Sequence, residues 1–167
     1  MTKSSVFISG DMKDVKDERE LVEWMIREVE PFKSLLDPIA LGRTAGPRPA
    51  ITESLRNARE CKMYIGIIGK DYSETTHKEF KEARKANNRC LVFVRVEKTR
   101  DPKVKKFIED VAKKEIIYKE FSDTPSLVKA VENSLQNELL RTLDFGLKVR
   151  GRPKKQHRRR QRGRSEA

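Results

Sequence analysis

Apolar residues in this chain gather in short continuous runs, and between the runs they recur at intervals of three or four positions. Continuous apolar runs bounded by polar or turn residues are typical of strands that are buried on both faces of a parallel sheet. The clearest run extends from Met63 to Ile68, between Lys62 and Gly69. On this basis we predict five strands, at residues 6–8, 34–40, 63–68, 90–96 and 116–118.

The segments between these runs have the spacing of amphipathic helices. Apolar residues between positions 21 and 29 fall on one face of a helix that begins near Asp14, and leucine or valine occupies every fourth position from 127 to 139. Further helices are predicted at 51–58, from Ser73–Thr76 to about Ala86, at 101–114 and at 127–141. Strands that alternate with helices form βαβ units. The predicted fold class is therefore α/β, a three-layer flavodoxin-like parallel sheet with strand order 2-1-3-4-5.

In such sheets, ligands bind beyond the carboxyl ends of the strands, where the strand order reverses. Here that point lies between the first and third strands, and the segments that follow them are the place to expect a site. Backbone N–H groups and a hydroxyl there can bind a phosphate or a ribose, although a tight turn without any ligand needs the same residues. The candidate nucleotide-binding residues are Ser9, Gly10, Asp11, Gly69, Lys70 and Tyr72.

The charge of the chain is concentrated at its C-terminal end. The formal net charge is +12, and residues 144–167 account for +8 of it, with ten basic and two acidic residues. Ten of the seventeen residues from 148 to 164 are Lys or Arg, and none is acidic. Such a segment buries too little apolar surface to order by itself and attracts polyanions. We therefore expect an α/β domain at 1–143 and a disordered basic tail at 144–167.

The tail contains two basic clusters. Arg150, Gly151, Arg152 and Pro153 match the core of an AT-hook, in which Gly lets the backbone lie deep in the minor groove and the flanking Arg side chains follow its floor. Nucleic acid, DNA or RNA, is the partner predicted for residues 148–164; the alternative is a solubilising tail without a specific partner. The remaining candidates for nucleic-acid contact are Lys154, Lys155, Arg158, Arg159, Arg160, Arg162 and Arg164.

Other features narrow the function class. Cys61 and Cys90 stand apart from each other and from any metal-ligand pattern, so no metal site is expected, and two lone thiols suit a reducing compartment. No apolar stretch approaches the ~20 residues of a membrane span. We expect a soluble, cytoplasmic protein without a membrane partner, associated with the nucleoid or ribosome in a prokaryote, or nuclear in a eukaryote.

Two segments carry a family resemblance. Residues 6–22 (VFISGDMKDVKDERELV) and residues 64–94, with YIGIIGKDYSETTHKEF at their start, resemble an uncharacterised prokaryotic TIR-like (Toll/interleukin-receptor-like) domain family. The second segment is also similar to nucleoside deoxyribosyltransferases, in which a Glu is followed by an Ala four residues later and by a strand about eleven residues later. Glu79, Ala83 and Cys90 occupy these positions. The resemblance covers residues 5–140.

This resemblance implies a chemistry for Glu79. In TIR-type NAD-cleaving enzymes and deoxyribosyltransferases, a Glu at this helix position acts on a ribosyl carbon as its N-glycosidic bond breaks, and an oxocarbenium-like centre needs a nearby carboxylate. NAD or another nucleotide would then be the substrate. The alternative is that Glu79 is a surface acid like Glu74 and Glu82. From the pattern alone, Arg19 and Glu18 could reach the point between the first and third strands, but a solvated helix face is favoured, and His77 is expected to be exposed.

Three function hypotheses follow. The first is a nucleic-acid-associated protein whose tail binds DNA or RNA and whose domain binds a nucleotide or a protein partner. The second is an enzyme, an NAD or nucleotide glycohydrolase or a deoxyribosyltransferase-like protein, that cleaves an N-glycosidic bond through Glu79. The third is an oligomerising TIR-like scaffold, a homo-oligomer without a small-molecule site.

Overall fold

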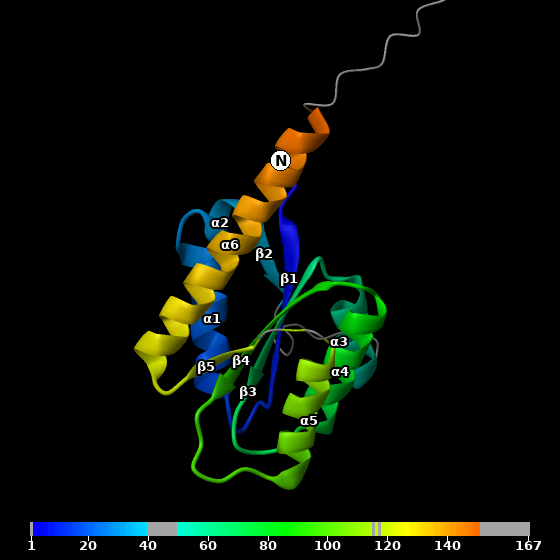
Figure 1. Ribbon diagram of the computed structural model, residues 1–167, viewed down its shortest axis with the longest axis vertical. Coiled ribbons are helices and arrows are strands. Elements are labelled where there is room, and N and C mark those ends of the chain that lie inside the picture. Colours follow the sequence, from blue (N-terminus) through cyan, green and yellow to red (C-terminus); the bar gives the residue numbers. More distant parts are fainter. Residues whose placement is uncertain (1, 40–49, 115, 117, 151–167) are drawn as a thin grey trace, which may run out of the picture. The chain divides into compact units, whose positions relative to one another are not determined.

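The computed structural model of the chain describes residues 2–39, 50–114, 116 and 118–150. Its centre is a parallel sheet of five strands in the order β2-β1-β3-β4-β5, which confirms the predicted fold class and strand order (Figure 1). The strands are β1 (Ser4–Gly10), β2 (Leu36–Ile39), β3 (Met63–Ile68), β4 (Arg89–Arg95) and β5 (Lys119–Phe121).

Helices cover both faces of this sheet. In Figure 1, α3, α4 and α5 lie on one side of the sheet, and α1 and α2 lie on the other. The helices are α1 (Lys16–Glu28), α2 (Phe32–Leu35), α3 (Ala50–Glu60), α4 (Glu74–Lys85), α5 (Pro102–Lys113) and α6 (Thr124–Arg150). None of the helices in the described part of the chain has the length and the apolar character that a membrane span requires.

The chain divides into two compact units, residues 1–135 and 136–167. The first unit contains the sheet, the helices α1 to α5 and the first turns of α6, in which Leu127, Val131 and Leu135 are fully buried. In the second unit, the described residues 136–150 continue α6. The domain limits at 143 and 144 stay a prediction.

The core explains why the sheet forms where the apolar runs predicted it. All six residues of β3 are buried, because β3 is the central strand and has helices on both of its faces. The Tyr64 ring lies 6.2 Å from the ring of Phe7 and 6.1 Å from that of Phe80, so aromatic contacts join two strands to α4. Burial of the Phe7 and Phe80 side chains contributes about 1.5–3 kcal/mol each.

Local capping sets the limits of α4 and fixes it against α3. Ser73 caps the first turn of α4, since its Oγ accepts the N–H of Thr76 at 3.2 Å, and Asn87, with φ of 59°, ends the helix in the left-handed region. The Asn88 side-chain amide then donates to the carbonyls of Ala58 and Arg59 at the C-terminal end of α3, at 2.9 and 3.0 Å. This contact ties the C-terminal ends of α3 and α4 together.

Several predicted element limits are wrong, among them those of the first strand, which extends over Ser4–Gly10 and not only over residues 6–8. The last strand was expected at 116–118, but pairing with β4 begins at Lys119, and Ile116 and Tyr118 instead pack beside the core as partly buried residues. At the second strand, residues 32–35 form a helical turn, so the strand begins at Leu36. The closing helix continues past Arg141 to Arg150, because no proline interrupts it between Pro125 and Pro153.

Candidate functional site

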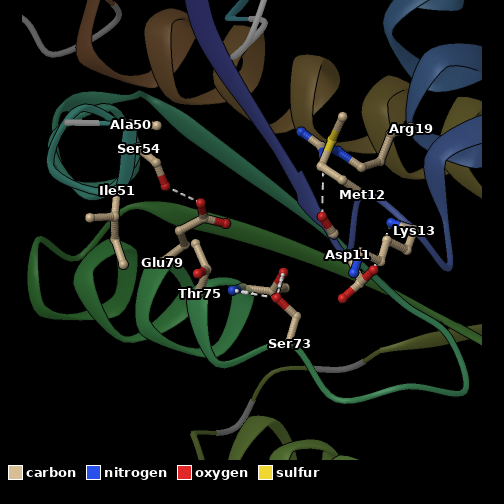
Figure 2. A pocket seen from close by; sticks show the side chains of 12 residues that line it. Asp11, Met12, Lys13, Arg19, Ala50, Ile51, Ser54, Ser73, Thr75 and Glu79 are labelled. Carbon is tan, nitrogen blue, oxygen red and sulfur yellow. Dashed lines mark hydrogen bonds between the residues drawn. The ribbon is translucent and has the colours of Figure 1, made fainter. Parts of the chain in front are cut away.

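A cavity of about 560 Å³ opens at the carboxyl end of β1, beside the N-terminal ends of α3 and α4 (Figure 2). This is the point between the first and third strands where the strand order reverses and where a ligand site was predicted. The lining residues come from the segment after β1, from α1, α3 and α4, and from the cap of α4: Gly10, Asp11, Met12, Lys13, Arg19, Ala50, Ile51, Ser54, Ser73, Thr75, Thr76 and Glu79.

Glu79 is the carboxylate of this cavity. Glu79 is buried, with only 5% of the residue exposed to solvent. The Ser9 hydroxyl donates to Oε2 of Glu79, and the Ser54 hydroxyl donates to Oε1, as Figure 2 shows for Ser54. Burial raises the pKa of Glu79, whereas the two hydroxyl groups and the positive charge of Arg19 act to lower it. Both carboxyl oxygens are therefore fixed in position.

The sequence of α4 turns Glu79 inward. Thr76, Phe80 and Ala83 form the buried face of the helix, and Glu79 lies on the same side. Glu74 and Glu82 differ from it, because Glu74 pairs with Lys78 at 2.7 Å on the exposed face and Glu82 pairs with Arg59 and Lys85. The interpretation of Glu79 as a surface acid is wrong.

The segment after β1 is held in a tight turn. Asp11 Oδ1 accepts the backbone N–H groups of Lys13 at 2.7 Å and Asp14 at 3.0 Å. A Cβ atom on Gly10 would lie 2.7 Å from Cγ2 of Val15, so only glycine fits there. Of the predicted nucleotide-binding residues, Gly10 and Asp11 line the cavity, and Ser9 contacts Glu79.

The other three predicted nucleotide-binding residues do not line this cavity. Gly69 permits the close approach of the turn after β1, since a Cβ there would lie 2.8 Å from Cγ1 of Val15. Lys70 is exposed. The Tyr72 hydroxyl lies 2.9 Å from Nδ1 of His77, and the His77 ring stacks on Phe107 at 4.2 Å. His77 is buried, at 7% exposed, so its predicted exposure is wrong.

Two residues of the site differ from the sequence-based expectation: the less favoured position of Arg19 is the one observed, and Ser54 was not predicted. Arg19 is partly buried against β1, and its Nη1 and Nη2 donate to the carbonyls of Gly10 at 3.2 Å and Ile8 at 3.3 Å, so its assignment to a solvated helix face is wrong. Ser54 lies on the buried face of α3, which also carries Ala58. A small polar residue at an apolar position of a helix was the signal that would have found it.

Electrostatics distinguish Arg19 from the other arginines near the sheet. Burial lowers the pKa of Arg19, and the nearby charge of Glu79 opposes this effect. Its Nε is buried and has no hydrogen-bond partner. Arg95, by contrast, forms ion pairs with Asp14, Glu18 and Glu97 at 2.5–2.8 Å. Arg19 is thus a cation in the wall of the cavity, whereas three carboxylates of the protein neutralise the charge of Arg95.

The remaining candidates fall outside the site. Arg150 is the last residue of α6, and the nucleic-acid candidates from Gly151 to Arg164 lie outside the described residues, so nucleic-acid binding and the AT-hook match stay predictions. Among the residues that the structure describes, no group of three or more His, Cys, Asp or Glu side chains is arranged to hold a metal ion.

Comparison with known proteins places this geometry in context. No curated protein matches the sequence significantly. Among solved structures, the chain is similar to the Clostridium botulinum CMP N-glycosidase BcmB, with a TM-score of 0.55 and 15% sequence identity. The similarity covers 78% of this chain and 98% of that protein. At this identity, the similarity shows a shared fold.

The family is shown by the sequence itself. Residues 5–136, which contain the whole sheet except Ser4 and all residues of the cavity, match a domain of unknown function, DUF4062. The match extends over most of the 167 residues. The chain therefore belongs to the DUF4062 family.

Proposed function

We propose that this protein cleaves the N-glycosidic bond of a nucleoside or nucleotide, with Glu79 as the group that acts on the anomeric carbon C1′. The observation that carries the proposal is the position of Glu79. It is a buried carboxylate at the wall of a cavity, and its two oxygens are held by Ser9 and Ser54. Breaking an N-glycosidic bond leaves positive charge on C1′, and a nearby carboxylate stabilises that charge.

The reaction follows from this arrangement. The C1′–N bond breaks and its electron pair stays on the nitrogen of the base. The base of a common nucleoside or nucleoside monophosphate then takes a proton from solvent, whereas the nicotinamide of NAD leaves neutral without one. One carboxylate oxygen of Glu79 forms an ester bond to C1′. Water then adds its oxygen to C1′ and gives up a proton, which releases the sugar and restores the Glu79 carboxylate. The sum is base plus sugar from substrate plus water.

The rest of the cavity supports a nucleoside-sized ligand. Its volume of about 560 Å³ lies within the range of roughly 300–1,000 Å³ that is typical of small-molecule sites. Met12, 55% exposed, and Ile51, 44% exposed, are large apolar side chains at its wall and offer apolar contact to a flat base. Thr75 lies at the same cavity and offers a hydroxyl for polar contacts, and the Ser73 hydroxyl, whose oxygen accepts from Thr76, retains its hydrogen for donation.

The comparisons support the class of bond. By its name, the Clostridium botulinum protein of similar fold is a CMP N-glycosidase. The resemblance to TIR-type NAD-cleaving enzymes and to deoxyribosyltransferases points to the same bond and to a Glu at the position of Glu79.

Release of free base from a panel of substrates tests the proposal. The panel contains the common ribonucleosides, their 5′-monophosphates, the deoxyribonucleosides and NAD, and chromatography detects the free base. The test variant is Glu79→Gln, and the matched control is Glu74→Gln, on the exposed face of the same helix. We expect a loss of at least about a hundredfold for Glu79→Gln and no substantial change for the control.

Two results would contradict the proposal. One is that the wild-type protein releases base from no member of the panel. The other is that base release continues at the wild-type rate in Glu79→Gln.

A further inference from the structure

The polar groups of the cavity are sorted between two walls. Glu79 and Ser54 lie on the wall formed by α3 and α4, and Arg19 and Lys13 lie on the opposite wall, near the end of β1 (Figure 2). Asp11 lies on that second wall as well, but its Oδ1 is bound to the backbone N–H groups of the turn. An anionic group bound at the second wall would be separated from the Glu79 carboxylate and would face two cations and this one carboxylate. This arrangement favours a ligand with a neutral part at Glu79 and an anionic part at the other end.

Arg19 is a cation that forms no ion pair with any residue the structure describes. Its guanidinium donates to the main-chain carbonyls of Ile8 and Gly10 and to Sδ of Met12, and its Nε is buried without a partner. In the described part of the chain, no carboxylate oxygen lies within 4.0 Å of its guanidinium nitrogens. A partly buried cation that is hydrogen-bonded only to neutral groups is costly, and carboxylates such as Glu79 offset this cost only in part, since burial still lowers the pKa of Arg19. An anionic ligand in contact would offset more of it.

Lys13 adds a second cation on the same wall. Its backbone N–H is bound to Asp11, which holds the turn, whereas the side chain is exposed at the cavity. The ammonium group has no ion pair within 4.0 Å among the described residues. A lysine of this kind is a flexible point charge that reaches phosphate oxygens readily.

We propose that Arg19 and Lys13 bind the 5′-phosphate of a nucleoside monophosphate and that Glu79 faces C1′ of the same molecule. This assignment rests on the proposed function and specifies nucleoside 5′-monophosphates, as distinct from free nucleosides, as the substrate class. Free nucleosides are neutral and leave both cations unpaired. A phosphate group carries about −1.5 to −2 charges near neutral pH and several acceptor oxygens, which match two cations.

Binding to an unreactive protein tests this assignment without the need for turnover. Calorimetry on Glu79→Gln would compare CMP, UMP, AMP and GMP with the four corresponding nucleosides and with inorganic phosphate. We expect at least one monophosphate to bind about tenfold or more tightly than its nucleoside. Lys13→Met in the same background should reduce that preference severalfold. The matched control is Lys16→Met, because Lys16 lies outside the cavity and pairs with Glu20.

Arg19 is tested with a conservative substitution as well, because its guanidinium also donates to two backbone carbonyls at the end of β1. Arg19→Lys keeps the positive charge, and we expect it to retain the preference for monophosphates, whereas Arg19→Gln should reduce it. Thermal unfolding of both variants identifies a loss of binding that comes from a loss of folding. If Arg19→Gln folds and keeps the full preference, Arg19 does not bind the phosphate.

The outcomes separate the two proposals. Equal binding of nucleosides and monophosphates, with Glu79-dependent base release from both, would overturn the phosphate assignment and leave the proposed function standing. Monophosphate binding that depends on Lys13, without base release by the wild-type protein, would overturn the proposed function and leave the phosphate site standing.

Discussion

Ser54 in α3 donates its hydroxyl hydrogen to Glu79 in α4, 25 residues further along the chain. Together with Ser9 at the end of β1, it holds both carboxyl oxygens of Glu79. The carboxylate is therefore oriented by two elements other than its own helix. Its ionisation should affect both the pH dependence of activity and the stability of the protein.

The first prediction concerns the pH dependence of activity. The hydroxyl groups of Ser54 and Ser9 favour the ionised form of Glu79 and lower its pKa, so removal of one of them raises the pKa. In Ser54→Ala, the acid limb of the pH profile of base release should move to higher pH. A profile measured from pH 4 to pH 8 checks this shift, and an acid limb at the wild-type position would show that Ser54 does not influence the ionisation of Glu79.

The second prediction concerns stability. Burial raises the pKa of folded Glu79 above the ordinary value of 4.5, so the folded state disfavours its ionised form. The stability that protonation provides is present below the unfolded pKa and is lost as the pH rises through the folded pKa. Glu79→Gln should therefore be more stable than the wild type at pH 7, and the difference should shrink towards pH 4.

Thermal unfolding at both pH values measures this effect. Each kcal/mol of added stability raises Tm by about 2–4 °C in a protein of this size. Glu74→Gln, with its exposed side chain, is the control. A Glu79→Gln variant that is less stable than the wild type at pH 7 would mean that the bonds from the two serines outweigh the cost of burial.

The third prediction concerns His77. Burial lowers the pKa of His77 below 6.5, although Asp110, with Oδ2 3.2 Å from Nε2, opposes the shift. A histidine with a lowered pKa contributes stability that is present above its unfolded pKa and lost as the pH falls through its folded pKa. Between pH 7 and pH 5, the wild type should lose more stability than His77→Gln, as followed by urea unfolding. If the free energy of unfolding changes equally with pH in the two proteins, the prediction is wrong.

The fourth prediction concerns the turn after β1. A Cβ on Gly10 would lie 2.7 Å from Cγ2 of Val15 and 3.0 Å from the carbonyl oxygen of Ile67. Gly10→Ala should therefore destabilise the protein by about 1–3 kcal/mol and displace the turn that carries Asp11 and Lys13. Urea unfolding gives the change in stability. An alanine variant as stable as the wild type would show that the turn can relax.

The fifth prediction concerns the basic tail. Removal of residues 151–167 should weaken binding to nucleic acid and reduce its salt dependence, since each phosphate contact contributes about −0.9 to the slope on B-DNA. Binding of the full-length and truncated proteins to AT-rich duplex, GC-rich duplex and structured RNA across a salt series measures both effects. Equal binding by the two proteins, or none by either, would remove the case for the tail as a nucleic-acid arm.

Much of the fold is visible in the sequence because its strongest signals are local. The continuous apolar run indicates β3, and the cap residues Ser73 and Asp101 indicate the starts of α4 and α5, in each case from neighbouring residues alone. The last strand was misplaced for the opposite reason. Residues 119–121 include Lys119 and Glu120, both exposed, and only their pairing with β4 makes them a strand.

Some residues of the site were likewise predictable from local sequence signals, and others were not. Glu79 and the segment after β1 were predicted from the strand order and from a family resemblance. Ser54 and Arg19 reach the site only through tertiary contacts, with Glu79 and with the carbonyls of β1 respectively. No spacing along the chain relates Ser54 to a residue 25 positions later. Partners of this kind depend on how α3 lies against α4, which a single sequence does not reveal.

The contact of Asn88 with α3 has a consequence for how such a site is inherited. Asn88 binds the last carbonyls of α3, so it sets the position of the helix that brings Ser54 to Glu79. Asn88 does not line the cavity, yet its contact with α3 influences the alignment of Ser54 with Glu79. Under the proposed function, a substitution at Asn88 would therefore reduce base release before it unfolds the sheet, and descendants that keep the fold but lose the activity are expected.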